Sequence, residues 1–143
     1  FSGEGCIRFT GNTEVNGPPD SPISYHIKIS TPGTYRVKML GLKAHMETGE
    51  GDKANECYLR MVGEEGWLGE FTKFVLLGES YTWWWNILGE PRYHEFEAPE
   101  YPLEAGRYKI QIAGRSKNFF IDKIVLFNTG LFEEQDITGL KEN

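Results

Sequence analysis

Cysteine and long apolar runs are both scarce in this sequence. Cysteine occurs only at Cys6 and Cys57, without the CxxC spacing that zinc sites use. In a secreted protein the two would form one disulfide; the alternative is two buried thiols, and the sequence leaves both open. No apolar run reaches the roughly 18 residues that a membrane-spanning helix needs, and no signal peptide is visible.

Positive charge and catalytic motifs are also limited. There are 15 Lys and Arg residues against 21 Asp and Glu residues, which gives a formal net charge of −6. An acidic surface repels nucleic acid and anionic lipid, so we expect neither as a partner. The sequence contains no GxSxG motif, no phosphate-binding loop and no dinucleotide fingerprint. Its 143 residues suit a single domain with a sizeable core.

Short β-rich runs separated by Gly, Pro, Asn and Asp make up most of the chain. Residues 23–29 (ISYHIKI) alternate apolar and polar side chains, which predicts a half-buried strand. The nearly all-apolar run 119–127 predicts a central strand covered on both faces. Further strands are expected at 6–10, 34–42, 56–62, 73–77, 81–88, 92–97 and 107–113. About eight strands and no long helix predict an all-β fold, an antiparallel sandwich or barrel.

The alternation ends near residue 128. We therefore expect one β-module at residues 1–128, followed by a tail or linker at 129–143. In that tail, Leu131 and Phe132 are the side chains expected to pack against the body of the module.

Four stretches give the chain a family resemblance that covers roughly residues 1–128. They are FSGEGCIRFTGN with the following ISYHIKISTPGTYRVKM, then NECYLRM, SYTWWW, and YPLEAGRYKIQIAGRSKNFFIDKIVLFN. In this order they resemble the carbohydrate-binding modules related to family 6, a galactose-binding-like β-jelly-roll group. The resemblance implies a jelly roll and a non-catalytic, secreted, monomeric sugar-binding module, joined to a polysaccharide-degrading enzyme.

An aromatic cluster at residues 81–85 is the principal candidate for sugar contact. Flat aromatic rings stack on the C–H face of a pyranose, while polar side chains bind its hydroxyls. In a strand, Tyr81, Trp83 and Trp85 would share one face and Trp84 the other, so at least one tryptophan should be exposed. The alternative is that all three tryptophans are buried. By the resemblance, Tyr81, Trp83 and Trp84 are the stacking candidates.

Two polar loops are expected to lie beside these rings. The first, residues 43–55, offers His45, Asp52 and Asn55; the second, residues 114–118, offers Arg115, Lys117 and Asn118. By the resemblance, both loops contribute polar contacts to the sugar. The alternatives are a solvated acidic first loop and a structural ion pair at Arg115.

Further interpretations concern the acidic residues and Trp67. Acidic ligands for calcium are present at Glu47, Glu50, Asp52 and Glu56, in a spacing unlike an EF-hand. Trp67 would be a second stacking platform or a lid on the sandwich edge. The resemblance assigns Asp122 to a structural calcium site. This sequence begins after the strand whose acids would complete that site, so we expect no required cofactor.

Two other function classes remain as alternatives. A jelly-roll polysaccharide lyase or glycoside hydrolase would need a catalytic set, and the lyase-like Gln111-Ile112-Ala113 lacks its histidine. A protein-interaction or adhesion sandwich would use the same aromatic residues as hot spots. The favoured ligand is a plant or algal polysaccharide, with an agar, porphyran or carrageenan galactan suggested by the family alone.

Overall fold

The computed structural model describes residues 5–10, 22–44, 53–64 and 69–137. These residues form ten strands and one short helix. In chain order the elements are β1 (Ile7–Arg8), β2 (Ile23–Ile29), β3 (Gly33–Lys43), β4 (Glu56–Gly63), β5 (Thr72–Leu76), β6 (Ile87–Arg92), β7 (Glu95–Glu97), β8 (Glu100–Leu103), β9 (Gly106–Gly114), β10 (Phe119–Asn128) and α1 (Glu134–Ile137).

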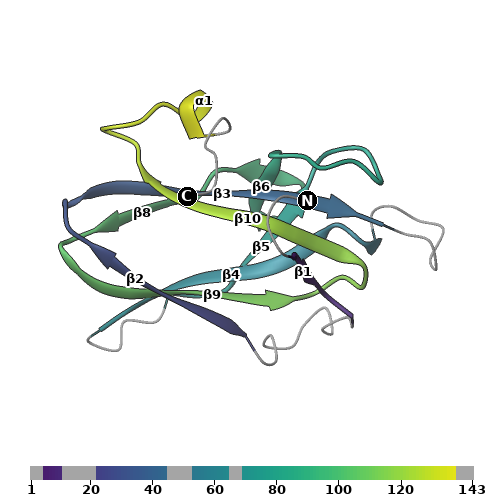
Figure 1. Cartoon of the computed structure of the whole chain (residues 1–143), viewed down its shortest axis with the longest axis horizontal. Helices are drawn as coiled ribbons and strands as arrows, with labels where there is room; N and C mark the ends of the chain where they lie inside the picture. Colours follow the sequence, from purple (N-terminus) through teal and green to yellow (C-terminus); the bar gives the residue numbers. More distant parts are fainter. Residues whose placement is uncertain (1–4, 11–21, 45–52, 65–68, 138–143) are drawn as a thin grey trace.

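The strands form two antiparallel sheets that face each other (Figure 1). One sheet has the order β1-β10-β3-β8 and the other the order β2-β9-β4-β5-β6-β7. The all-β sandwich expected from the sequence is therefore confirmed. The described residues contain ten strands. β8 lies where the sequence pattern predicts no strand, and the expected strand 92–97 is divided between the end of β6 and β7.

Period-two alternation determines which side chains enter the core. On β3, Tyr35, Val37 and Met39 are buried as expected, and on β9 Ile110 and Ile112 are buried opposite them. These side chains meet the rings and aliphatic groups of the remaining strands between the two sheets. The fully buried set includes Phe74, Phe119, Met39, Leu59, Met61, Leu76, Ile87, Ile112, Ile121 and Cys57.

A β-bulge interrupts the alternation on β10, which pairs with β1 on one side and β3 on the other. Ile121 is opposite Gly41 and Lys123 is opposite Leu40, so Asp122 is the extra residue. The extra residue exchanges the two faces of β10 on which odd-numbered and even-numbered side chains lie. Ile121 and Ile124 therefore both point between the sheets although they are separated by an odd spacing.

The expected face of β2 is also confirmed by its register, since Tyr25 is opposite Ile110 and Ile27 is opposite Tyr108. β2 is an edge strand, and its core-facing side chains become progressively less covered toward its start. Tyr25 is 39% exposed although it lies on the same face as the buried Ile29. The sandwich is thus incompletely closed where β2 faces β1 and β10.

Both cysteines are free thiols, so the disulfide alternative is not realised. Cys57 is fully buried on the core face of β4, and Cys6 is partly exposed before β1. The expected packing of Leu131 and Phe132 is wrong, because both side chains are exposed, and Ile137 of α1 is buried instead. In the described ranges, no helix is both long and apolar enough to cross a membrane.

Gly41 provides a test of the packing between the sheets. A Cβ at this position would lie 2.7 Å from Ile87 Cδ1 and 3.0 Å from the Phe120 carbonyl oxygen. Gly41→Ala should therefore lower the free energy of unfolding by about 1–3 kcal/mol through overpacking. Gly5→Ala is the matched control, since a Cβ there has no neighbour within 4 Å. Equal midpoints for the two variants in denaturant titrations would contradict the described packing.

Candidate functional site

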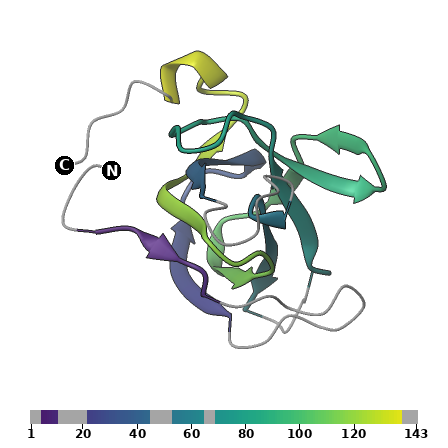
Figure 2. The same ribbon diagram turned by 90° about the vertical axis from the view of Figure 1, so that its right-hand side faces the viewer.

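Several strand ends meet at one end of the sandwich, which Figure 2 shows facing the viewer. β3, β5 and β9 end there, while β4, β6 and β10 begin there; the register pairs Lys43 with Phe119, Cys57 with Gly114 and Leu76 with Ile87. The segments that leave these strand ends include residues 77–86, 44–55 and 114–118. The three loops expected to form the site thus start from the same end of the molecule.

Residues 77–86, the aromatic loop, do not form the expected strand. Tyr81 has a φ of 60°, in the left-handed region, and regular β-structure begins only at Ile87. The loop pairs with β3 of the opposite sheet. Trp84 N–H donates to the Gly41 carbonyl at 2.8 Å, Gly41 N–H donates to the Trp84 carbonyl at 3.0 Å, and Tyr81 N–H donates to the Lys43 carbonyl at 2.9 Å. These bonds hold the loop across the end of the sandwich.

Two rings of the aromatic loop are open to solvent. Tyr81 is 52% exposed and Trp84 is 38% exposed, whereas Trp83 and Trp85 are half-buried. The expectation of at least one exposed tryptophan is confirmed. Trp84 packs against Gly78, where any Cβ would overlap the indole ring. A backbone without a side chain therefore supports part of the indole and leaves the rest accessible.

The structure describes only the first two and the last three residues of the loop 43–55. His45 and Asp52, together with Glu47 and Glu50, lie outside the described residues, as does Trp67. Asn55 is buried, and its carbonyl oxygen accepts the Leu76 N–H at 2.8 Å. Its side-chain Nδ2 donates to the Leu76 carbonyl at 3.4 Å. Asn55 thus joins the start of β4 to the end of β5 and presents little surface to a ligand.

Asn118 joins three segments at the same end. Its backbone has a φ of 62°, its carbonyl oxygen accepts the Ala44 N–H at 3.0 Å, and its own N–H donates to the Phe9 carbonyl at 2.8 Å. Its side-chain Oδ1 accepts a bond from Arg8 Nη2 at 2.7 Å. Asn118 is only 4% exposed, so its amide shapes the loop. The neighbouring Lys117 is half-buried.

Arg115 lies in a chain of ion pairs on the outer face of the six-stranded sheet. Its guanidinium pairs with Glu56, Glu56 pairs with Lys73 at 3.2 Å between Oε1 and Nζ, and Lys73 pairs with Glu90. Burial lowers the pKa of Arg115, and the Glu56 carboxylate supplies the opposite charge that a buried cation needs. Arg115 was expected either to contact the sugar or to form a structural ion pair, and the structure contains the ion pair.

The possible calcium ligands are separated in the fold. Asp122 lies on the β10 bulge, whereas Glu56 is paired with Arg115 and Lys73 on the six-stranded sheet. Within the part of the chain that the structure describes, no group of three or more His, Cys, Asp or Glu side chains could hold a metal ion.

The C-terminal segment contacts the aromatic loop through Lys38. This lysine points away from the core on β3 and is buried beneath the segment that contains α1. Its Nζ pairs with the Glu134 carboxylate and donates to the Trp85 carbonyl at 3.4 Å. Through Lys38, Glu134 therefore takes part in holding the aromatic loop, a role that the loss of alternation in the sequence did not reveal.

A second group of exposed rings lies on the β6–β7 hairpin, which projects from the sandwich in Figure 2. The ring centroids of Tyr93 and His94 are 4.0 Å apart, and those of His94 and Phe96 are 6.3 Å apart. Tyr93 is 84% exposed. Glu90 Oε1 accepts the His94 N–H at 2.7 Å and fixes the turn, where His94 has a φ of 61°. Sequence reasoning had assigned residues 92–97 to one strand and missed this cluster.

In comparisons with known proteins, no family model, no curated protein and no solved structure matches the chain. The resemblance to sugar-binding modules therefore rests on the motifs in the sequence.

Glu90 gives a pH-dependent prediction. Burial would raise the pKa of Glu90, but Lys73 and the His94 N–H outweigh it and hold the pKa below its ordinary value of 4.5. The stabilisation is therefore present at neutral pH and is lost as the pH falls through the folded-state pKa. Glu90→Gln should lower the free energy of unfolding by about 1–3 kcal/mol at pH 7, and the difference from wild type should shrink near pH 3. Equal losses in denaturant titrations at both pH values would contradict the ionic contribution.

The Lys38 contact gives a prediction about the order of the aromatic loop. Glu134→Gln should destabilise the chain by only about 1 kcal/mol, because Glu134 is half exposed, but it leaves the buried Lys38 without its counter-charge. Amide hydrogen exchange in residues 77–86 should accelerate as a result. The neighbouring Glu133→Gln changes the net charge equally and should leave that exchange unchanged. Unchanged exchange in Glu134→Gln would show that the contact does not hold the loop.

Proposed function

We propose that this chain is a non-catalytic carbohydrate-binding module that contacts its ligand through the aromatic loop. The observation that carries the proposal is the exposure of Tyr81 and Trp84 on a loop that backbone hydrogen bonds hold against β3. Exposed rings cost hydration free energy, so a loop that keeps them accessible and ordered suits a surface that binds a flat apolar partner. The C–H face of a pyranose ring is such a partner.

Preorganisation supports the proposal. Because Gly41 pairs with Trp84 and Gly78 supports its indole, the ring loses little freedom when a ligand stacks on it. Polar groups around the loop would bind the hydroxyls at the rim of the sugar. Lys43 and Lys117 belong to the segments that meet beside the loop, and His45 and Asp52 remain candidates.

The motif resemblance adds the biological setting of the proposal. It suggests a secreted module joined to a polysaccharide-degrading enzyme, with a plant or algal polysaccharide as ligand and a galactan as the first candidate. A shallow exposed site of this kind would bind with a Kd between about 1 µM and 1 mM. Such an affinity is sufficient for a linked enzyme, since attachment to the polymer raises the local concentration of the catalytic domain.

Substitution of Trp84 tests the proposal directly. Trp84→Ala should weaken binding by about 1–3 kcal/mol, the free energy of a lost stacking contact, without unfolding the domain. Tyr93→Ala is the matched control, because it removes a highly exposed ring that is not part of the aromatic loop. Affinity electrophoresis against agar, porphyran, carrageenan and several plant polysaccharides provides the measurement.

Gly78→Ala supplies a second test that retains the indole. The added methyl group would displace the Trp84 ring, so binding should weaken although every aromatic residue remains. Equal loss of binding in Trp84→Ala and Tyr93→Ala would indicate nonspecific adhesion of exposed rings. Wild-type affinity in Tyr81→Ala, Trp83→Ala and Trp84→Ala would place the ligand elsewhere and refute the site.

A further inference from the structure

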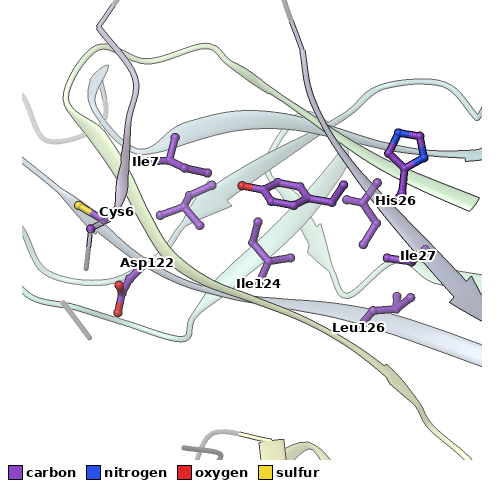
Figure 3. Close-up of a pocket in the computed structure, with 11 residues that line it drawn as sticks. Cys6, Ile7, His26, Ile27, Asp122, Ile124 and Leu126 are labelled. Atoms are coloured by element: carbon purple, nitrogen blue, oxygen red, sulfur yellow. The ribbon is translucent and has the colours of Figure 1, made fainter. Parts of the chain in front are cut away.

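A cavity of about 550 Å³ lies between the two sheets at their incompletely closed edge (Figure 3). One wall comes from β1 and β10 and the other from β2 and β9. The β10 bulge forms part of the first wall, since Ile121, Asp122 and Ile124 all line the cavity. None of the lining residues belongs to the aromatic loop. The volume falls within the range of about 300–1,000 Å³ that small-molecule sites occupy.

The middle of the cavity is lined by branched aliphatic side chains. Ile7, Ile27, Ile124 and Leu126 lie along it in Figure 3, between walls that also include Ile110 and Ile121. Tyr25 adds a partly exposed ring to this surface. Water in contact with these side chains is unfavourable, and an aliphatic ligand that replaced it would gain roughly 25 cal/mol for each Å² of apolar surface that it covers.

Polar groups occur at the two ends of the cavity. Cys6 and Asp122 lie together at one end in Figure 3, and His26 lies at the other. A carboxylate accepts hydrogen bonds at several positions, so Asp122 favours a hydroxyl or ammonium head group and repels a carboxylate. The net charge of −6 disfavours an anionic ligand as well.

We propose that this cavity binds a small, mainly aliphatic molecule whose hydroxyl or amine head group lies at the Cys6–Asp122 end. The combination of an apolar middle with an acidic end carries the proposal. The site is separate from the aromatic loop, and its test does not depend on sugar binding.

Cys6 provides a native reporter for occupation of the cavity. Burial raises the pKa of the fully buried Cys57 thiol, so Cys57 should react slowly and Cys6 should account for the labelling of the folded chain by a maleimide. Decanol at about ten times its Kd should slow the labelling of Cys6 about tenfold. Cys6→Ser should abolish the rapid labelling and so identify the reporting thiol. No slowing at any soluble decanol concentration would overturn the proposal.

The head group is tested with ligands of the same chain length. Decylamine should protect Cys6 as well as decanol does, and decanoate should protect it far less, because of the Asp122 carboxylate. Equal protection by decanoate would refute the assignment of the acidic end as the head-group site. Asp122→Asn should reduce the discrimination against decanoate while preserving protection by decanol.

A variant that fills the cavity separates specific binding from general detergent effects. Ile124→Phe adds side-chain volume inside the cavity and should remove the protection by decanol without lowering the thermal midpoint. Val125→Phe adds a ring at the next position of β10, on the opposite face, and should retain the protection. Protection that persists in Ile124→Phe would place the decanol elsewhere and contradict the proposal.

Discussion

The antiparallel pairing of β3 with β10 is the interaction on which most other features of this structure depend. It is the most extensive pairing in the fold and runs from Lys43 opposite Phe119 to Asn128 opposite Tyr35. β3 contributes Tyr35, Val37 and Met39 to the core through one face, while Lys38 on the other face contacts the C-terminal segment. The end of β3 also pairs with the aromatic loop. One long strand thus joins the core, the tail and the candidate sugar site.

The pairing of the aromatic loop with β3 connects the two sheets. The aromatic loop follows β5 of the six-stranded sheet, but it bonds to Gly41 of the four-stranded sheet. The loop can therefore keep Trp84 exposed without becoming loosely held, because backbone bonds rather than ring burial determine its position. The proposed sugar site and the proposed aliphatic site rely on the same strand pairing, at the end of β3 and at the β10 bulge.

The strands were predictable where local sequence and tertiary environment agree. Residues 23–29 alternate strictly and are bounded by Pro22 and by Ser30, and the predicted limits of β2 are those of the structure. The strand predicted to include Tyr81 to Trp85 does not form there, for a physical reason. Its aromatic residues favour strands locally, but the left-handed backbone at Tyr81 and pairing with a distant strand determine the conformation. A local sequence pattern does not predict pairing between segments that are far apart along the chain.

The candidate site was less predictable than the fold. The exposure of a tryptophan followed from the crowding of rings in one short segment, and the convergence of loops followed from the resemblance. The separate parts played by Asn118 and Arg115 could not be read from the sequence, because they depend on Arg8 and Glu56, partners remote along the chain. The bulge at Asp122 could not be predicted either, since an inserted residue changes which side chains face the core without altering the composition of an apolar run.

The edge strand β7 has a consequence for the behaviour of many copies held close together. Its sequence is Glu95-Phe96-Glu97, all three side chains are exposed, and it ends the six-stranded sheet. An open edge is a template for joining another sheet, but two copies aligned there would bring glutamates of equal charge together. The repulsion disfavours the joining of two copies into one continuous sheet through their β7 edges, so this edge would resist association even at high local concentrations of the chain.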